Sequence, residues 1–492
     1  MKNNQLSLTG RARRRALPLL AGLGLTLAAT SSCNSFLDVA PQGQPTSEQF
    51  FQTQNDATLA VNAMYGKLRE WNLVAFNWLS VTTLTSDDAE KGSVSGDAEF
   101  LNDFTFFRIS PAEGSVEGYW TGQYQEINLC NQVIQKVPAI SMDAALKARY
   151  LGEAQFLRAL MYFNLVRAFG DVPLHTKVAE TGDELNPARS PQADVYALIV
   201  SDLTAAAGVL PPSYPATDLG RATKGAALAL LSKVKLYQKD YAGALAASDQ
   251  VIGLGYSLAP DFYDMFRIRG ENGPESIFEV QCTTLAGNCD ASNSQWAECQ
   301  MVRPQFGWGF FNPTADLVAA FEPGDKRLLG TVLFRGTTTP DGDVIDPNAA
   351  NPRYNMKAYV PNAAPKTCGY GRDQNIRVLR LGEVLLINAE AANELGQGAK
   401  ALADVNQIRV RAGLAPLAAG LAQDALRQAI WQERRVELAL EYGDRYFDLV
   451  RTGRAATVLK AKGFVAGKNE VMPIPLSQIT LSGGKLTQNP GY

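Results

Sequence analysis

The chain has 492 residues, of which 46% are hydrophobic and 19% are charged, and this globular composition excludes a disordered or collagen-like protein. A single histidine, His175, excludes a histidine-rich metal site and any mechanism that needs a histidine pair. Without residues 1–32, which hold five basic and no acidic side chains, 41 basic residues face 49 acidic ones, and this net charge of −8 makes nucleic acid a poor partner.

Residues 1–32 have the layout of a secretory signal peptide. Basic residues end at Arg15, an apolar run follows over 16–29, and small residues precede Cys33. This run is too short for a permanent membrane span, and no later run approaches the length of about 18 residues that a span needs. We expect Cys33 to become the lipidated first residue of the mature chain; the alternative is an ordinary cleaved signal beside an incidental cysteine.

Three long helices are predicted in the first half of the mature chain. Apolar spacing predicts helices over 54–70 and 116–137. The segment 144–169 contains one glycine and no proline, and its second half is apolar on nearly every side, so it belongs in an interior. Gly170 followed by Pro173 predicts its end.

Two segments, 228–252 and 385–409, are alike when they are aligned 157 residues apart. Each contains a long apolar helix, a short polar turn and a second helix that opens near Ala-Leu. This is the plan of a tetratricopeptide-like hairpin of about 34 residues. Because one hairpin cannot bury both of its faces, each must pack on neighbouring elements.

Residues 270–372 form a turn-rich region between these hairpins. Only a strand over 276–280 and a helix over 313–321 are predicted there. Loop-rich regions on a regular scaffold often carry the binding surface.

The cysteines are divided between a helix and this region. Cys130 lies on an apolar helical stripe and is predicted to be a buried free thiol. In an exported chain the other four predict two disulfides of open connectivity: Cys282, Cys289, Cys299 and Cys368.

Aromatic residues in the loop-rich region are the candidates for ligand contact, because a flat ring can cover the apolar face of a sugar while nearby polar groups bind its hydroxyls. The alternative for each is that it anchors the packing of its loop. Trp71, Trp78 and Trp120 lie in or beside apolar helical segments and are predicted to be core residues. The predicted ligand-binding residues are Trp296, Trp308, Gln295, Tyr354 and Tyr370.

Acidic clusters offer a catalytic alternative. Glu433, Glu437 and Glu441 are spaced to share one helix face, which fits a glycosidase with two carboxylates. A structural ion-pair network is the better interpretation, because arginines lie close by at 434, 435, 445 and 451. We expect Asp87 and Asp88 to cap a helix or form a turn.

The sequence resembles the SusD/RagB group of outer-membrane nutrient-binding lipoproteins of Bacteroidota. The resemblance rests on segments in a fixed order that span the mature chain: CNSFLD (33–38), SDDAE (86–90), FLRALMYFNLVRAFGDVPL (156–174), the two hairpins, ERRVELALEYGDRYFDLVRTG (433–453) and PIPLSQITLSGGKLTQNPGY (473–492).

This resemblance implies one mainly helical domain over 33–492, in which tetratricopeptide-like hairpins form a superhelical scaffold and a loop-rich region with few short strands carries the ligand. It further implies a lipid-anchored protein on the cell surface at the outer membrane. Such a protein captures a glycan or other nutrient and delivers it to a SusC-like TonB-dependent transporter, without catalysis, cofactor or metal. The alternatives are a surface glycoside hydrolase and a ligand-free tetratricopeptide-type scaffold.

Overall fold

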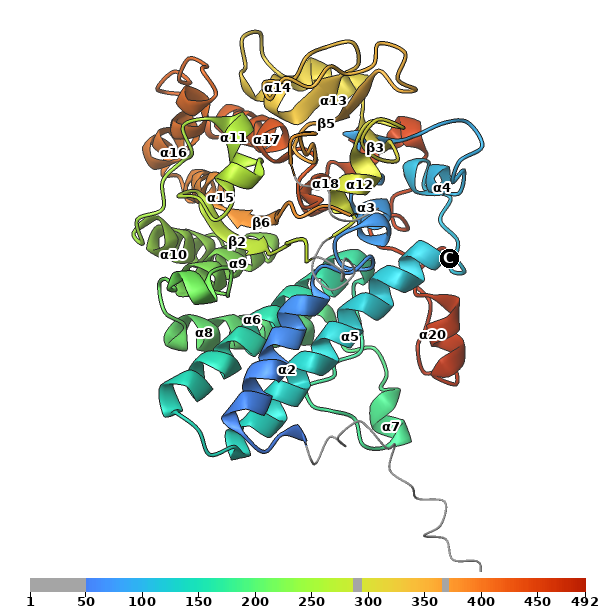
Figure 1. Cartoon of the computed structure of the whole chain (residues 1–492), viewed down its shortest axis with the longest axis vertical. Coiled ribbons are helices and arrows are strands. Elements are labelled where there is room, and N and C mark those ends of the chain that lie inside the picture. Colours follow the sequence, from blue (N-terminus) through green and yellow to red (C-terminus); the bar gives the residue numbers. More distant parts are fainter. Residues whose placement is uncertain (1–49, 286–293, 365–370) are drawn as a thin grey trace, which may run out of the picture. The chain divides into compact units, whose positions relative to one another are not determined.

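The protein is mainly α-helical, as predicted, in the parts that the computed structural model describes, namely residues 50–285, 294–364 and 371–492 (Figure 1). The predicted signal peptide and the candidates Cys33, Cys289, Cys368 and Tyr370 lie outside the described residues. Residues 52–492 form one compact unit. Among the described helices, none has the length and apolar character that a membrane span requires.

A layer of long helices forms the first part of this unit: α2 (Gln54–Lys67), α5 (Gly114–Lys136), α6 (Ala144–Phe169) and α8 (Gln192–Val209). Helix α6 packs between α5 and α8, and α2 lies against α5 and α6 (Figure 1). The side chain of Asp143 caps α6 by accepting a hydrogen bond from the Leu146 N–H at 2.8 Å. The helix covers the predicted range, and its second half is buried on every side.

Both predicted hairpins are present. The first consists of α9 (Lys224–Tyr237) and α10 (Tyr241–Ile252), and the second of α15 (Leu381–Glu394) and α16 (Gly398–Arg411). Helix α10 packs on α15, and Leu236 and Ala244 meet Ile387 and Ala391 in a shared core cluster. The hairpins therefore bury their apolar faces on each other, as stacked repeats do.

The loop-rich region carries only short elements, as predicted. Each described sheet is a two-stranded antiparallel pair: β1 (Ala89–Gly92) with β3 (Phe310–Pro313), β2 (Ser276–Val280) with β6 (Ile376–Arg380), and β4 (Val332–Phe334) with β5 (Arg353–Asn355). The helices of this region are α12 (Trp296–Gln300), α13 (Ala315–Ala320) and α14 (Arg327–Thr331), and α11 (Phe262–Met265) lies shortly before it.

The chain ends in α17 (Gln423–Leu438), α18 (Asp444–Arg451), α19 (Ala455–Val458) and α20 (Leu476–Leu481). Helix α17 packs on α15, and α18 packs on α3 (Phe76–Thr82). The C-terminal helices thus connect the hairpins to the first part of the unit. Two further short helices are α4 (Leu101–Thr105) and α7 (Gly182–Leu185).

Candidate functional site

Trp296 and Tyr354 are buried packing residues, and this burial argues against the predicted contact with ligand. Trp296 is 5% exposed at the start of α12, and Tyr354 on β5 is 0% exposed. The Tyr354 hydroxyl accepts a hydrogen bond from the Asn351 N–H at 3.0 Å, and its ring packs against Gly309. Contacts between segments bury both rings, and a buried ring cannot cover a sugar.

Trp308, in contrast, is half-buried at the mouth of a cleft. Its backbone N–H donates to the Glu298 carbonyl at 2.8 Å, which folds the 302–308 loop back onto α12. A side chain on Gly307 would place its Cβ only 2.3 Å from that carbonyl, so glycine is required beside the indole. Gln295 is half-buried directly before α12 and does not line this cleft.

Trp71 lies next to Trp308 and was missed as a site residue. The two ring centroids are 5.8 Å apart with planes tilted by 53°. Trp71 is half-buried in the turn between α2 and α3, so the prediction of a core residue is wrong for it but correct for Trp78 and Trp120. Behind it, Phe76 stacks at 5.1 Å and touches the buried ring of Phe310. Trp71 therefore packs between Trp308 and a cluster of phenylalanine rings.

The cleft beside Trp308 has a volume of about 390 Å³. Its charged groups are paired: Arg372 lies 2.7 Å from Glu298, and Arg303 pairs with Asp97. Gln305 is exposed, and its side-chain amide contacts the 344–346 segment by donating to the Val344 carbonyl at 2.7 Å. The lining residues are Glu298, Arg303, Pro304, Gln305, Phe306, Gly307, Trp308 and Arg372.

The carboxylates that suggested a glycosidase lie in a buried ion-pair network. Glu437 is its centre, at 2.5 Å from Arg380 and 2.9 Å from Arg327, with Arg411 as a further partner. Glu433 and Glu437 lie on α17, but Glu441 lies beyond the end of that helix, so the expectation of one shared helix is wrong for it. The helix ends at Leu438 because the backbone turns away at Ala439 and has a positive φ at Leu440.

Burial and charge act in opposite directions on this network. Burial alone would raise the pKa of Glu437, but Arg411, Arg380 and Arg327 outweigh it and hold that pKa well below its ordinary value. Burial lowers the pKa of Lys357, which pairs with Glu441 at 2.6 Å, to about 8. Such permanently paired groups stabilise the fold and are not arranged as an acid and a base across a cleft.

The arginines predicted to neutralise these glutamates bind other carboxylates. Arg434 pairs with Glu383 at 2.7 Å, and Arg451 pairs with Glu390 at 2.6 Å. The prediction of a network is confirmed, but its predicted partners are wrong, because residues close in sequence point to different sides of α17 and α18.

Asp87 and Asp88 lie in a bend, where the Asp88 N–H donates to the Ser86 hydroxyl at 3.2 Å, and their carboxylates form ion pairs and cap no helix. Arg445 donates to both oxygens of Asp87 at 2.7 and 2.8 Å, and Arg435 donates to Asp88 at 2.8 Å. These contacts join the segment after α3 to α17 and α18.

Cys130, Cys282 and Cys299 are buried free thiols. This confirms the prediction for Cys130, but two disulfides among the four loop cysteines would need both Cys282 and Cys299, so that prediction is wrong. Cys282 follows β2 and donates to the Val280 carbonyl at 3.8 Å, whereas Cys299 is enclosed within α12. Packing in separate elements accounts for their burial.

Comparison with known proteins decides the family. Residues 274–492 match the SusD family, and residues 35–236 match a second family described as "Starch-binding associating with outer membrane". SusD-like protein P2 of Formosa agariphila is 28% identical over 93% of this chain and 96% of its own. A solved laminarin-binding SusD-like protein is 30% identical, covers 90% of this chain and 100% of its own, and has a TM-score of 0.77.

The chain belongs to the SusD family. A further solved member, surface glycan-binding protein A from Bacteroides fluxus, is 26% identical with a TM-score of 0.77, and the alignment covers 90% of this chain and 100% of that one. Two segments that carried the resemblance, 86–90 and 433–453, meet in the ion pairs described above. Within this SusD-family fold they connect elements, whereas the Trp71–Trp308 pair is accessible.

Proposed function

We propose that this protein is a surface glycan-binding subunit of a nutrient importer, and that it holds a sugar chain at the cleft lined by Trp308, with Trp71 packed next to that indole. The observation that carries the proposal is the pair of half-buried indoles at 5.8 Å, tilted by 53° beside a cleft of about 390 Å³. Two tilted aromatic faces suit a curved ligand with repeated apolar faces, which describes an oligosaccharide.

The pairing of the charges supports a neutral ligand. Arg372 and Arg303 are neutralised by Glu298 and Asp97, so recognition depends on ring contact and neutral hydrogen bonds. The similarity to a laminarin-binding SusD-like protein makes β-glucan oligosaccharides the first probes to use.

The same proposal includes an anchor and a partner. Cys33 carries lipid that holds the mature chain at the outer membrane, and a SusC-like TonB-dependent transporter receives the ligand. The match to a family described as associating with the outer membrane supports this location. The protein binds without cleaving, which agrees with the structural use of Glu433 and Glu437.

Calorimetric titration with laminarihexaose and maltohexaose tests the site. Trp308→Ala and Trp71→Ala should each weaken binding about ten- to hundredfold, because an indole contributes about 1.5–3 kcal/mol through burial. Trp431→Ala is the matched control, since Trp431 is also half-buried but is covered by Arg454 outside the cleft.

Undiminished binding by both cleft variants would remove the site. A reducing-sugar assay over a long incubation accompanies the titration. Sustained product release by the purified protein would favour the hydrolase, and no sugar binding at all would favour the ligand-free scaffold.

A further inference from the structure

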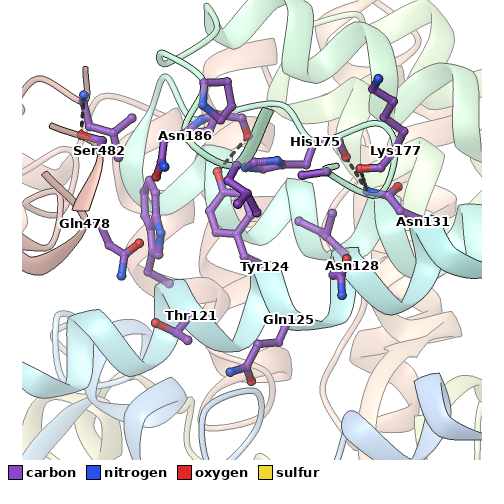
Figure 2. A pocket seen from close by; sticks show the side chains of 17 residues that line it. Thr121, Tyr124, Gln125, Asn128, Asn131, His175, Lys177, Asn186, Gln478 and Ser482 are labelled. Atoms are coloured by element: carbon purple, nitrogen blue, oxygen red, sulfur yellow. Dashed lines mark hydrogen bonds between the residues drawn. The ribbon is translucent and has the colours of Figure 1, made fainter. Parts of the chain in front are cut away.

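A second pocket of about 320 Å³ lies between α5, the 173–187 segment and α20, away from the residues that line the Trp308 cleft. Tyr124 of α5 is half-buried and contributes aromatic surface, and the buried ring of Trp120 packs against it with the ring centroids 5.0 Å apart. Figure 2 shows Thr121, Gln125 and Asn128 along α5, with Asn186 and Gln478 on other walls of the pocket.

The wall opposite α5 is held in place by buried polar groups. The Asn131 amide donates to the carbonyls of His175 and Lys177 at 2.8 and 3.3 Å. Arg158, itself paired with Asp202 at 2.8 Å, donates to the Thr176 carbonyl at 3.1 Å. A wall fixed in this way is formed before any ligand arrives.

The third wall, α20, is fixed to the same helix. The Ser477 hydroxyl donates to Glu117 at 2.7 Å, and the Leu476 N–H donates to the Pro111 carbonyl at 2.8 Å. Lys485, after α20, pairs with Asp183 of α7 at 2.8 Å. All three walls are therefore connected, and the pocket does not depend on one exposed loop.

Several polar groups in this pocket have no partner within the described part of the chain. The Thr121 hydroxyl, the Asn128 and Gln478 amides and the His175 imidazole all line the pocket without an internal hydrogen bond. Among the described residues that line the pocket there is no carboxylate, and the one cation, Lys177, pairs with Glu184. The pocket thus offers neutral donors and acceptors beside aromatic rings.

We propose that this pocket is a second carbohydrate-binding site, which takes a neutral mono- or disaccharide unit. Unpaired amides and a hydroxyl match the dense hydroxyls of a sugar, while the half-buried ring of Tyr124 matches its apolar face. An anion would lack an unpaired cation here, and a cation would lack a carboxylate. The volume is near the lower end of the range for small-molecule pockets, about 300–1,000 Å³, which suits a unit of this size.

This inference depends on the proposed function only for its choice of probes. A second site of weak affinity on the same molecule would raise the apparent affinity for a long glycan that reaches both sites, because the second contact becomes intramolecular. The Trp308 cleft and this pocket can therefore be tested separately with short ligands.

His175 is the only histidine in the chain, so it reports on this pocket alone. The experiment uses protein without a histidine tag, labelled with ¹³C-histidine, and follows the single imidazole signal by NMR. Laminaribiose, maltose and glucose are titrated into the original protein and into Trp308→Ala. We expect a saturable shift with at least one sugar, with the same midpoint in both proteins.

Asn128→Ala should weaken sugar binding at this pocket about three- to tenfold, because the variant loses one neutral hydrogen bond to the ligand. Asn128 is exposed without a partner in the described chain, so its removal should leave the fold intact. The matched control is Gln250→Ala, an exposed amide on α10 that lines no pocket described here, and it should change nothing.

An unmoved His175 signal, with Trp308-dependent binding still present in calorimetry, would overturn the second site and leave the proposed function standing. A sugar-dependent shift of the His175 signal without any Trp308-dependent binding would support the second site and overturn the proposed Trp308 site. A neutral tripeptide, N-acetyl-triglycine amide, tests whether the pocket binds peptides instead of sugars. A shift of the His175 signal with this peptide, but with none of the sugars, would also overturn the proposal.

Discussion

At the scale of single residues, burial separates the aromatic side chains that build the fold from those that can bind. Trp296 and Trp308 both lie in the loop-rich region, yet one is 5% exposed and the other is half-buried at a cleft. Their sequence neighbours are similarly small and polar, so only contacts between segments distinguish them. The same contacts bring Trp71 to Trp308, although 237 positions separate them.

Trp296→Ala should therefore lower stability and leave the direct ligand contacts in place. Removing a large buried aromatic ring costs about 3–5 kcal/mol, because the space it leaves does not close fully. Urea unfolding followed by circular dichroism measures the loss, and calorimetry in the absence of urea measures sugar affinity. An unchanged unfolding midpoint together with lost sugar binding would show that Trp296 is a ligand-binding residue.

The three described cysteines should resist alkylation in the folded protein. Burial raises the pKa of the Cys130, Cys282 and Cys299 thiols, so little thiolate is present near neutral pH. Iodoacetamide treatment before and after unfolding, followed by peptide mass mapping, checks each thiol separately. Rapid labelling of any of the three in the folded protein would contradict the prediction.

At the scale of elements, regular patterns were predicted far better than loops. The helix at 144–169, the strand at 276–280 and both hairpins occur where apolar spacing and end signals placed them, because local periodicity determines such elements. The candidate site was predicted only in part. Trp308 was predicted because it lies in the loop-rich region, but Trp71 sits among apolar residues and has no local signal of exposure.

The ion pairs illustrate the same limit. A helical spacing indicated that Glu433 and Glu437 share a face, and they do. Their partners Arg327 and Arg380 come from positions more than 50 residues away, from α14 and from the end of β6. No pattern within a single segment could have identified them.

Glu437→Gln should destabilise the protein by about 3–5 kcal/mol near neutral pH, because it leaves buried guanidinium groups without their counter-charge. The pKa of Glu437 is held well below its ordinary value of 4.5. The stabilisation that ionised Glu437 gives to the folded state is therefore complete above pH 4.5 and is lost as the pH falls below 4.5 toward the pKa of the folded protein. Urea unfolding at pH 7 and pH 4 should show the difference between the two proteins shrinking at the lower pH.

The control for this prediction is Asp424→Asn on the same helix. Asp424 is 88% exposed and pairs with Arg427 at the surface, so its loss should change stability by less than about 1 kcal/mol. Equal effects of the two substitutions would contradict the structural role of the buried network.

Gly443→Ala tests the connection between α17 and α18. Gly443 has a φ of +74°, and a Cβ there would lie 2.2 Å from the hydroxyl of the buried Thr82. Gly453, at the other end of α18, has a similar φ of +71° but open space around it. We expect about 1–2 kcal/mol of destabilisation for Gly453→Ala from the backbone alone, and about 1–3 kcal/mol more for Gly443→Ala from the clash. Thermal unfolding of both variants measures the difference.

At the scale of the whole molecule, binding and anchoring are assigned to separate parts of the chain. The Trp308 cleft and the second pocket lie within the compact unit of residues 52–492, whereas Cys33 precedes it.

Cys33→Ala should therefore release the protein from the membrane without changing what it binds. In the proposed function the Cys33 thiol is the attachment point for acyl chains, and since one chain gives only marginal binding, stable attachment needs more than one. Fractionation of cells should move the variant from the outer membrane to a soluble fraction, and mass spectrometry of the original protein should find lipid on its mature N-terminus. The released variant, titrated with laminarihexaose, should keep the affinity of the original protein, because both binding regions lie beyond residue 51. A variant that stays with the outer membrane, together with an N-terminus that carries no lipid, would show that another part of the chain or a bound partner provides the anchor.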